Sequence, residues 1–264
     1  MRSILVAASL AIGLAAGAAH AQKAKPDYWP ELVANVFDGR AIEDGASVIA
    51  LEAPYRAEDA AIVPITIRSA LPAGSPLRVE KITLVIDQNP SPVAAEFTFG
   101  DGGTVHAIET RVRVDAYTKV HVVAEASDGK LYMAEAFVKA AGGCSSPGLK
   151  NIAVADVGEM KFRRFATDAA SGVADAQIMI RHPNNSGLQR DPINNYYIPA
   201  FFVQELTLNV GGKLLMRMEG GISISENPTF RLSYRAADAP VTAEAVDTKG
   251  KRYQGAWPAG GEGT

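Results

Sequence analysis

The chain has 264 residues and a formal net charge of −3 at pH 7, from 26 Lys and Arg against 29 Asp and Glu. Because basic and acidic residues are interspersed, the chain lacks the basic footprint of a nucleic-acid binder, and no nucleic-acid partner is expected. The sequence contains a single cysteine, which excludes an intramolecular disulfide.

The first 21 residues have the three parts of a secretory signal peptide. Residues 1–3 carry a positive charge, residues 4–19 are an apolar run, and Ala19-His20-Ala21 has the small-x-small form of a cleavage site. We therefore expect export by the general secretory route, cleavage after Ala21 and a periplasmic location. A retained anchor is the alternative. No later apolar stretch is long enough to span a bilayer, so no membrane association is expected.

About 240 residues follow the signal peptide, enough for two ordinary domains. Large apolar residues at helical spacing predict a short helix over residues 29–37, with Pro30 in its first turn and Gly39 as its stop. After Gly39, short β-branched segments bounded by Gly, Pro, Asn or Asp are typical of strands. In the first half we expect strands at residues 62–67, 82–86, 111–114, 120–124 and 131–137.

The only cysteine lies in a glycine- and serine-rich segment. Residues 140–148 read Ala-Ala-Gly-Gly-Cys-Ser-Ser-Pro-Gly, and these residue types favour a flexible, exposed backbone. Cysteine is usually buried as a small inert hydrophobe, so a thiol here indicates a chemical role for Cys144. The alternative is a tolerated surface residue. Gly142 and Gly143 are either a plain domain linker or a functional arm that presents Cys144.

The second half has the same pattern of short strand-like segments as the first. Strands are expected at residues 176–180, 201–210, 213–218, 230–234 and 241–246. Two stretches indicate an internal repeat: residues 84–91 parallel 222–229 around the dipeptides Asn89-Pro90 and Asn227-Pro228, and residues 123–137 parallel 242–257. Many short strands with turns at this spacing predict an all-β fold of two tandem immunoglobulin-like β-sandwich domains with a short N-terminal helix.

The predicted organisation has four parts. They are the signal peptide (1–21), a first sandwich (22–140), a Gly-rich, Cys144-bearing linker (141–156) and a second sandwich (157–264). Cys144 is thus expected on the connection between the domains.

No enzymatic constellation is recognisable in the sequence. A glycine-rich phosphate loop, a Gly-x-Ser-x-Gly elbow and a His-Glu-x-x-His helix are all missing. His121 is expected to point out from a strand face, and His182 is expected to be a capped turn residue, with a role facing a partner or substrate as its alternative. We expect no catalytic residue, no metal and no cofactor.

Four aromatic residues lie close together in the second half. They are Tyr196, Tyr197, Phe201 and Phe202. We expect them to pack in the core or between the domains, and a docking surface is the alternative.

Several motifs resemble two families of sulfur-oxidation proteins. The first half is similar to SoxY in residues 60–65, 86–90, 129–132 and 138–144, and the second half is similar to SoxZ in residues 180–188, 198–203 and 223–228. The likeness covers most of the chain from Trp29 to Trp257. The whole resembles the fused SoxYZ-like carriers associated with quinoprotein dehydrogenases.

The resemblance implies a non-enzymatic carrier for sulfur (thiosulfate) oxidation. In SoxY-type proteins a cysteine in a Gly-Gly-Cys-Gly-Gly tail holds the sulfur substrate while partner enzymes act on it. This implies that Cys144 is the attachment residue, that Gly142 and Gly143 form the carrier arm, and that the partners are periplasmic redox enzymes of the Sox or quinoprotein dehydrogenase type. Ser145 and Ser146 stand where that tail has glycines, and the chain continues into a second domain.

Two other functions remain open. The protein could be an adaptor that docks an exported quinoprotein dehydrogenase or its cytochrome through a sandwich face, with Cys144 dispensable. It could also be a thiol enzyme, which would need a histidine within hydrogen-bonding distance of Cys144.

Overall fold

The computed structural model describes residues 27–147, 154–165 and 171–260. The expected signal peptide lies outside the described residues, as do residues 148–153 of the expected linker. No helix in the described part of the chain is long and apolar enough to cross a membrane.

The first half contains one helix and eight strands within residues 27–147. They are α1 (Trp29–Val36), β1 (Ile42–Asp44), β2 (Ile49–Glu52), β3 (Val63–Ser69), β4 (Val79–Ile86), β5 (Val93–Phe99), β6 (Thr104–Val112), β7 (Thr118–Ala126) and β8 (Leu131–Val138). The described part of the second half contains a short 3-10 helix and seven strands. They are η1 (Val154–Asp156), β9 (Met160–Arg164), β10 (Ala174–Ile180), β11 (Val203–Val210), β12 (Lys213–Gly220), β13 (Thr229–Arg235), β14 (Val241–Asp247) and β15 (Arg252–Trp257).

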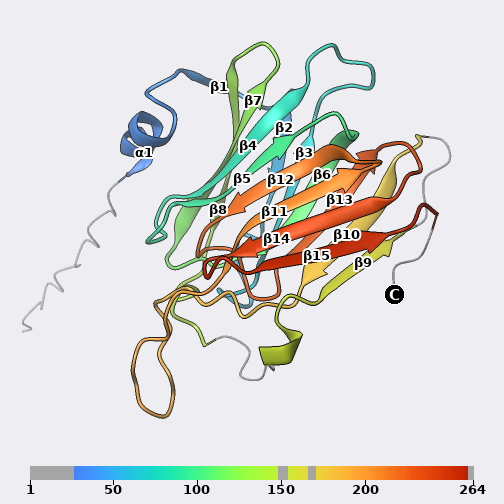
Figure 1. Ribbon diagram of the computed structural model, residues 1–264. Coiled ribbons are helices and arrows are strands. Elements are labelled where there is room, and N and C mark those ends of the chain that lie inside the picture. The colour runs from blue at the N-terminus through green and yellow to red at the C-terminus, as the bar shows by residue number, and fades with distance from the viewer. Residues whose placement is uncertain (1–26, 148–153, 166–170, 261–264) are drawn as a thin grey trace, which may run out of the picture.

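The strands form two sheets that both run through the two halves of the chain (Figure 1). Sheet A has the order β1-β8-β7-β4-β5-β12-β11-β14-β15, and sheet B has the order β2-β3-β6-β13-β10-β9. The all-β sandwich class with a short N-terminal helix is therefore confirmed. The two sandwiches are joined edge to edge rather than strung out along a linker.

Two antiparallel strand pairs make this junction. In sheet A, β5 pairs with β12, with Phe97 opposite Met218; in sheet B, β6 pairs with β13, with Ile108 opposite Leu232. Each pairing hydrogen-bonds two strands that would otherwise be exposed sheet edges. One continuous hydrophobic core follows, and in it the rings of Phe97 and Phe230 meet edge to face at 6.1 Å across the halves.

The internal repeat is present in the topology. The strands from β3 to β8 alternate between the sheets as B-A-A-B-A-A, and those from β10 to β15 follow the same sequence. The match of residues 123–137 with 242–257 is therefore correct, because both stretches form the last hairpin of their half. The match around the Asn-Pro dipeptides was wrong: Asn89-Pro90 joins two strands of sheet A, whereas Asn227-Pro228 leads from sheet A to sheet B.

The predicted helix and nine of the ten predicted strands are found, and β15 was indicated by the repeat alone. The strand predicted at residues 111–114 overlaps only the last two residues of β6, which begins at Thr104. Four further strands were missed, namely β1, β2, β5 and β9. The sequence of β5, Val-Ala-Ala-Glu-Phe-Thr-Phe, contains two alanines, which are depleted in strands, and that of β9, Met-Lys-Phe-Arg-Arg, carries three basic residues on a sheet edge. The missed β5 is the strand that joins the halves in sheet A.

Helix α1 covers the outer face of sheet A. Trp29 stacks on the ring of His121 with 3.7 Å between the ring centroids, and the two ring nitrogens of His121 face Asp87 Oδ1 at 2.9 Å and Glu135 Oε2 at 3.1 Å. His121 does point out from its strand, as predicted. It is nevertheless fully buried, because α1 lies over it.

The shared core predicts one cooperative unfolding transition. Phe97→Ala removes a fully buried ring at the junction and should lower the free energy of unfolding by about 3–5 kcal/mol. Urea denaturation followed by fluorescence and circular dichroism measures this. Phe137→Ala, at a residue that is 43 % exposed, is the control and should change stability by no more than about 0.5 kcal/mol. Two separate transitions, with only one moved by Phe97→Ala, would contradict the shared core.

Candidate functional site

Cys144 lies in a tight turn that packs against the end of β6. After β8 the chain runs beside residues 113–115, which directly follow β6. The Gly142 N–H donates to the Asp115 carbonyl oxygen at 2.8 Å, and the Gly143 N–H donates to the Val114 carbonyl oxygen at 3.0 Å. The Cys144 N–H donates to the Asp115 carboxylate at 3.3 Å. Residues 142–146, here called the Cys144 turn, are thus held by backbone hydrogen bonds.

The two glycines of the predicted arm have different roles in the turn. Gly142 has φ +78°, a left-handed backbone that side chains disfavour. At Gly143 a β-carbon would lie 2.0 Å from the Ala60 carbonyl oxygen and 2.7 Å from that of Val114. Gly142 therefore suits a left-handed position, and Gly143 allows a close approach to Ala60 and Val114. The arm is packed in this conformation, and its flexibility stays a prediction.

The thiol itself is buried, which contradicts the expected exposure. Cys144 has no solvent-accessible surface. Burial and the nearby Asp115 carboxylate raise the pKa of the Cys144 thiol to about 12, and the Arg113 guanidinium offsets this only in part. In this conformation the sulfur is a neutral thiol that water and reagents do not reach.

The second half of the chain closes over the Cys144 turn. The Ser186 hydroxyl donates to the Cys144 carbonyl oxygen, and Gln189 Nε2 donates to the Ser146 carbonyl oxygen at 3.0 Å. Arg113, fully buried, bridges the halves by donating to the carbonyl oxygens of Gly143 at 3.2 Å and Asn184 at 3.4 Å. The turn is therefore held from both sides of the junction.

The two serines after Cys144 close the turn on itself. The hydroxyls of Ser145 and Ser146 donate to the Gly142 carbonyl oxygen at 3.2 and 3.0 Å, and their backbone N–H groups point to the same oxygen. Glycines at these positions could not make the two side-chain hydrogen bonds. The serines thus favour the closed turn.

The comparisons with known proteins match the two halves of the chain separately. Residues 33–144 match the family described as sulfur oxidation protein SoxY, and residues 162–258 match the family described as sulphur oxidation protein SoxZ. The chain belongs to the SoxY and SoxZ families in tandem. It is a fused SoxYZ-like protein, as the sequence resemblance indicated, and the SoxY match ends at Cys144. These domains support a carrier-like role in Sox-type sulfur oxidation, in families of non-enzymatic carriers and adaptors.

The other comparisons add little. No curated protein matches the chain. Among solved structures, a variant of the superoxide reductase (neelaredoxin) from Ignicoccus hospitalis matches with 12% sequence identity and a TM-score of 0.31, over 36% of this chain and 81% of that one.

The histidines do not complete a catalytic pair with Cys144. Of the described histidines, none lies within hydrogen-bonding distance of the thiol, so the structure offers no support for a thiol enzyme. His182 is a buried turn residue as predicted: its Nδ1 accepts from the Asn184 N–H at 3.1 Å, and burial lowers its pKa to about 4. In the described part of the chain, no cluster of three or more His, Cys, Asp or Glu side chains could bind a metal.

Four residues at the Cys144 turn were missed by the sequence interpretation. They are Arg113, Asp115, Ser186 and Gln189. Arg113 and Asp115 follow β6 and sit next to the turn only because the chain returns along that strand. Ser186 lies within the SoxZ-like stretch of the sequence, but nothing in that stretch indicates that it contacts Cys144.

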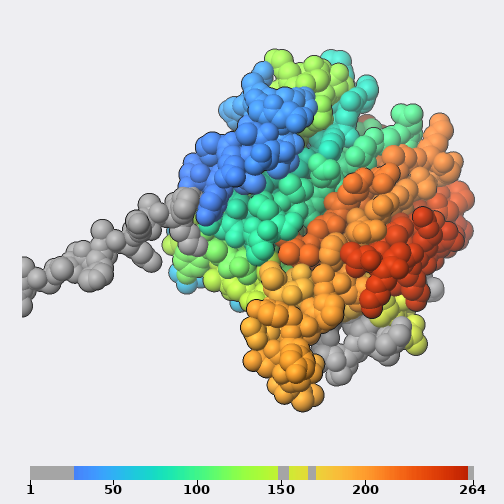
Figure 2. All heavy atoms as spheres, turned by 60° about the vertical axis from the view of Figure 1, so that its left-hand side comes forward, coloured from blue at the N-terminus to red at the C-terminus, as the bar shows by residue number. Residues whose placement is uncertain are grey.

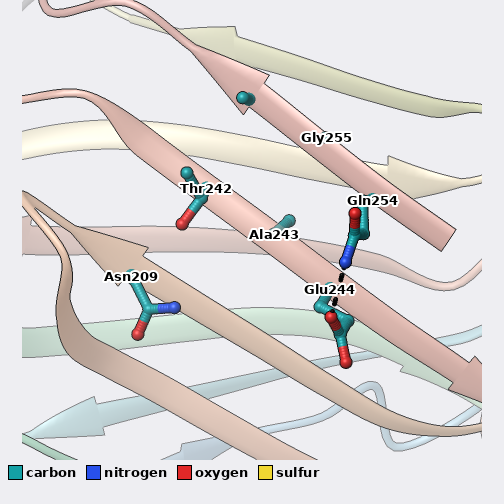
Figure 3. Close-up of a pocket in the computed structure, with 7 residues that line it drawn as sticks. Asn209, Thr242, Ala243, Glu244, Gln254 and Gly255 are labelled. Carbon is teal, nitrogen blue, oxygen red and sulfur yellow. Dashed lines mark hydrogen bonds between the residues drawn. The ribbon is translucent and has the colours of Figure 1, made fainter. Parts of the chain in front are cut away.

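A shallow depression of about 400 Å³ lies on the outer face of sheet A in the SoxZ half (Figure 3). Its lining from β11, β14 and β15 includes Asn209, Thr242, Glu244 and Gln254. By the repeat, this is the face that α1 covers in the SoxY half. Its lining mixes these polar side chains with Ala243, Gly255 and Ala256, and the depression is open to solvent.

Two of the four aromatic residues lie on the surface. Tyr196 and Tyr197 are 75 % and 59 % exposed, whereas Phe201 and Phe202 are half-buried, and Phe201 contacts His182. The prediction that these residues pack in the core or between the domains was therefore wrong for the two tyrosines.

The buried thiol should make the protein less stable at high pH. Because the pKa of Cys144 is about 12 in the folded chain and about 9 ordinarily, the unfolded chain loses this proton first as pH rises. The contribution of the protonated Cys144 thiol to the free energy of unfolding is fully present below pH 9. It is lost between pH 9 and 12, by up to about 1.4 kcal/mol per pH unit. Urea denaturation at pH 7 to 11 measures it. Cys144→Ser cannot titrate there, so the difference between the two pH curves isolates the thiol; identical slopes would contradict its burial.

Proposed function

We propose that this protein is a non-enzymatic, Sox-type carrier of the periplasm that holds a small sulfur-containing intermediate covalently on Cys144. The position of Cys144 carries the proposal: it ends the SoxY match, and the SoxZ half contacts its turn through Ser186 and Gln189. The one thiol of the chain thus lies where both domains meet. Signal-like residues 1–21 support export.

The chemistry of attachment requires partner enzymes. Joining the Cys144 thiol to a sulfur compound R–SH as a Cys–S–S–R disulfide releases two protons and two electrons. A partner redox protein must accept the electrons, since no described side chain can. A quinoprotein dehydrogenase or a Sox enzyme with its cytochrome fits that need.

Loading also requires the Cys144 turn to open. A thiolate is the nucleophile, and a thiol with a pKa of about 12 is ionised to only about one part in 10⁵ at pH 7. An exposed cysteine, with a pKa of about 8.5, is ionised to a few per cent. The carrier therefore has a closed, unreactive form, described above, and an open form in which Cys144 leaves the junction.

A second candidate function is favoured by the same burial. The protein could be an adaptor that docks an exported quinoprotein dehydrogenase or its cytochrome, with Cys144 serving only as a packed residue. Under that proposal Cys144→Ser keeps full physiological function.

Intact-mass spectrometry of the protein purified from its source separates the two candidates. The carrier predicts a chain that begins at Gln22 and bears a sulfur-containing adduct, removed by dithiothreitol and missing in Cys144→Ser. It also predicts that Cys144→Ser abolishes sulfur oxidation in the source cells. A thiol that stays bare during growth on a reduced sulfur compound, together with full activity of the variant, would refute the carrier and support the adaptor.

The serines of the turn give a second test. The double variant Ser145→Gly, Ser146→Gly removes the two hydroxyl bonds to Gly142 and should raise the maleimide labelling rate of Cys144 at pH 7 at least several-fold. The matched control is Ser75→Gly, at a serine far along the chain in the loop before β4. An unchanged labelling rate in the double variant would show that the serines do not hold the turn closed.

A further inference from the structure

A hairpin of the SoxZ half projects from the body of the molecule next to the Cys144 turn. Residues 189–198 form the lowest loop in Figures 1 and 2, in gold and orange, and stand clear of both sheets. Ile193 is 94 % exposed, and the neighbouring Tyr196 and Tyr197 are the other large apolar side chains at its tip. The three side chains together form an exposed apolar patch, which is more informative than a single exposed aliphatic residue.

The tip is ordered despite its exposure. The Asp191 carboxylate accepts from the N–H groups of Ile193 at 2.8 Å and Asn194 at 3.1 Å, and the Asp191 N–H donates to the Tyr196 carbonyl oxygen at 2.9 Å. Arg190 lies over the Tyr197 ring at 4.3 Å and donates to its hydroxyl at 3.0 Å. The fold therefore presents Ile193 and Tyr196 in a fixed geometry, which lowers the ordering entropy that binding would otherwise cost.

The base of the hairpin is bonded to the Cys144 turn. Gln189 begins the hairpin, where its carbonyl oxygen accepts from the Ile198 N–H at 2.9 Å. The side chain of Gln189 donates to the Ser146 carbonyl oxygen and accepts from the Ser186 N–H at 3.1 Å. Ser186 in turn donates to Cys144. A displacement of the hairpin thus acts directly on the bonds that keep the turn closed.

We propose that the 189–198 hairpin docks a redox partner protein, whose concave apolar pocket accepts Ile193 and Tyr196, and that docking loosens the Cys144 turn through Gln189. The docking step holds for a carrier and for an adaptor; the loosening step rests on the proposed carrier function.

A second copy of this chain is the less suitable occupant. Two narrow tips that meet each other bury only a small area, and head-to-tail association would need an apolar pocket to receive the tip. Two open depressions, of about 400 Å³ on sheet A and about 420 Å³ beside α1, carry charged and amide side chains next to their small or apolar ones. Glu244 and Gln254 line the first, and Glu31 and Asp87 line the second, so neither is an apolar pocket for an isoleucine and a tyrosine. A specific interface also buries about 800 Å² per partner. The hairpin tip is too small for that, so a partner must also cover the adjoining end of the sandwich, where Cys144 lies.

Site-specific photo-crosslinking in the source cells tests the docking. A benzoylphenylalanine placed at position 193 should give an adduct with an exported protein that contains haem or a quinone cofactor, whereas the same probe at position 28, where Tyr28 is 40 % exposed, should not. The protein identified in that adduct is then purified and titrated. The double variant Ile193→Asp, Tyr196→Ser should bind it at least tenfold more weakly, while Ile193→Val and Tyr28→Ser should stay within twofold of the parent chain.

Maleimide labelling of Cys144 tests the coupling. The purified partner should speed labelling of the parent chain at least tenfold and should not affect the double variant at the same concentration. Gln189→Ala should raise the labelling rate without partner and, because it removes the link between hairpin and turn, should reduce the acceleration by the partner to less than twofold. Equal labelling with and without saturating partner would overturn the coupling.

The remaining outcomes also decide the proposal. Equal yields of crosslinked adduct from probes at positions 193 and 28 would overturn the docking. So would a probe at position 193 that crosslinks to nothing except lipid or another copy of this chain. Full loading of Cys144 in the Ile193→Asp, Tyr196→Ser variant would overturn it too, while leaving the carrier function intact. Partner binding through Ile193 with a permanently bare Cys144 would support docking and refute the carrier.

Discussion

The rest of the structure depends on the antiparallel pairing of β5 with β12 and of β6 with β13. These two pairings turn four potential sheet edges into the middle of two continuous sheets. They also merge the SoxY and SoxZ cores into one, around Phe97 and Phe230. As a result, the end of the SoxY domain lies against the SoxZ domain, and the segment that carries Cys144 is bonded to both domains.

The junction beside Cys144 is polar, and this matters for its behaviour. Arg113 is completely buried; burial lowers its pKa from the usual value, the charge of Glu226 offsets this in part, and its Nε has no hydrogen-bond partner among the described residues. Buried polar groups stabilise a structure only when they are well satisfied. The turn is therefore held by many individually modest hydrogen bonds, a type of contact that a competing partner can replace more readily than packed hydrocarbon.

The sequence was sufficient for the fold class, the repeat and the families, because strand periodicity and local motifs are properties of short segments. It was insufficient for the Cys144 turn. Gly142 and Gly143 look the same in a flexible tether and in a close-packed turn, and only the carbonyl oxygens of Ala60 and Val114, distant in the chain, decide between them. The same limit applies to Tyr196: its exposure depends on a hairpin whose order comes from Asp191, and the aromatic spacing alone indicated packing.

Fusion changes what a carrier cysteine can do. Even if the open form were populated to only about one part in 10³, its thiol, with an ordinary pKa, would supply more thiolate at pH 7 than the whole closed population with a pKa of about 12. Reactivity is therefore set by the opening equilibrium of the turn and not by the closed site. A partner that binds the open form preferentially by about 4 kcal/mol raises the ratio of open to closed forms about a thousandfold. In the oxidising compartment that we propose for this protein, a thiol held closed until then is also shielded from stray oxidation. The fused SoxZ domain can thus protect Cys144 between encounters, a task that a free glycine tail does not perform.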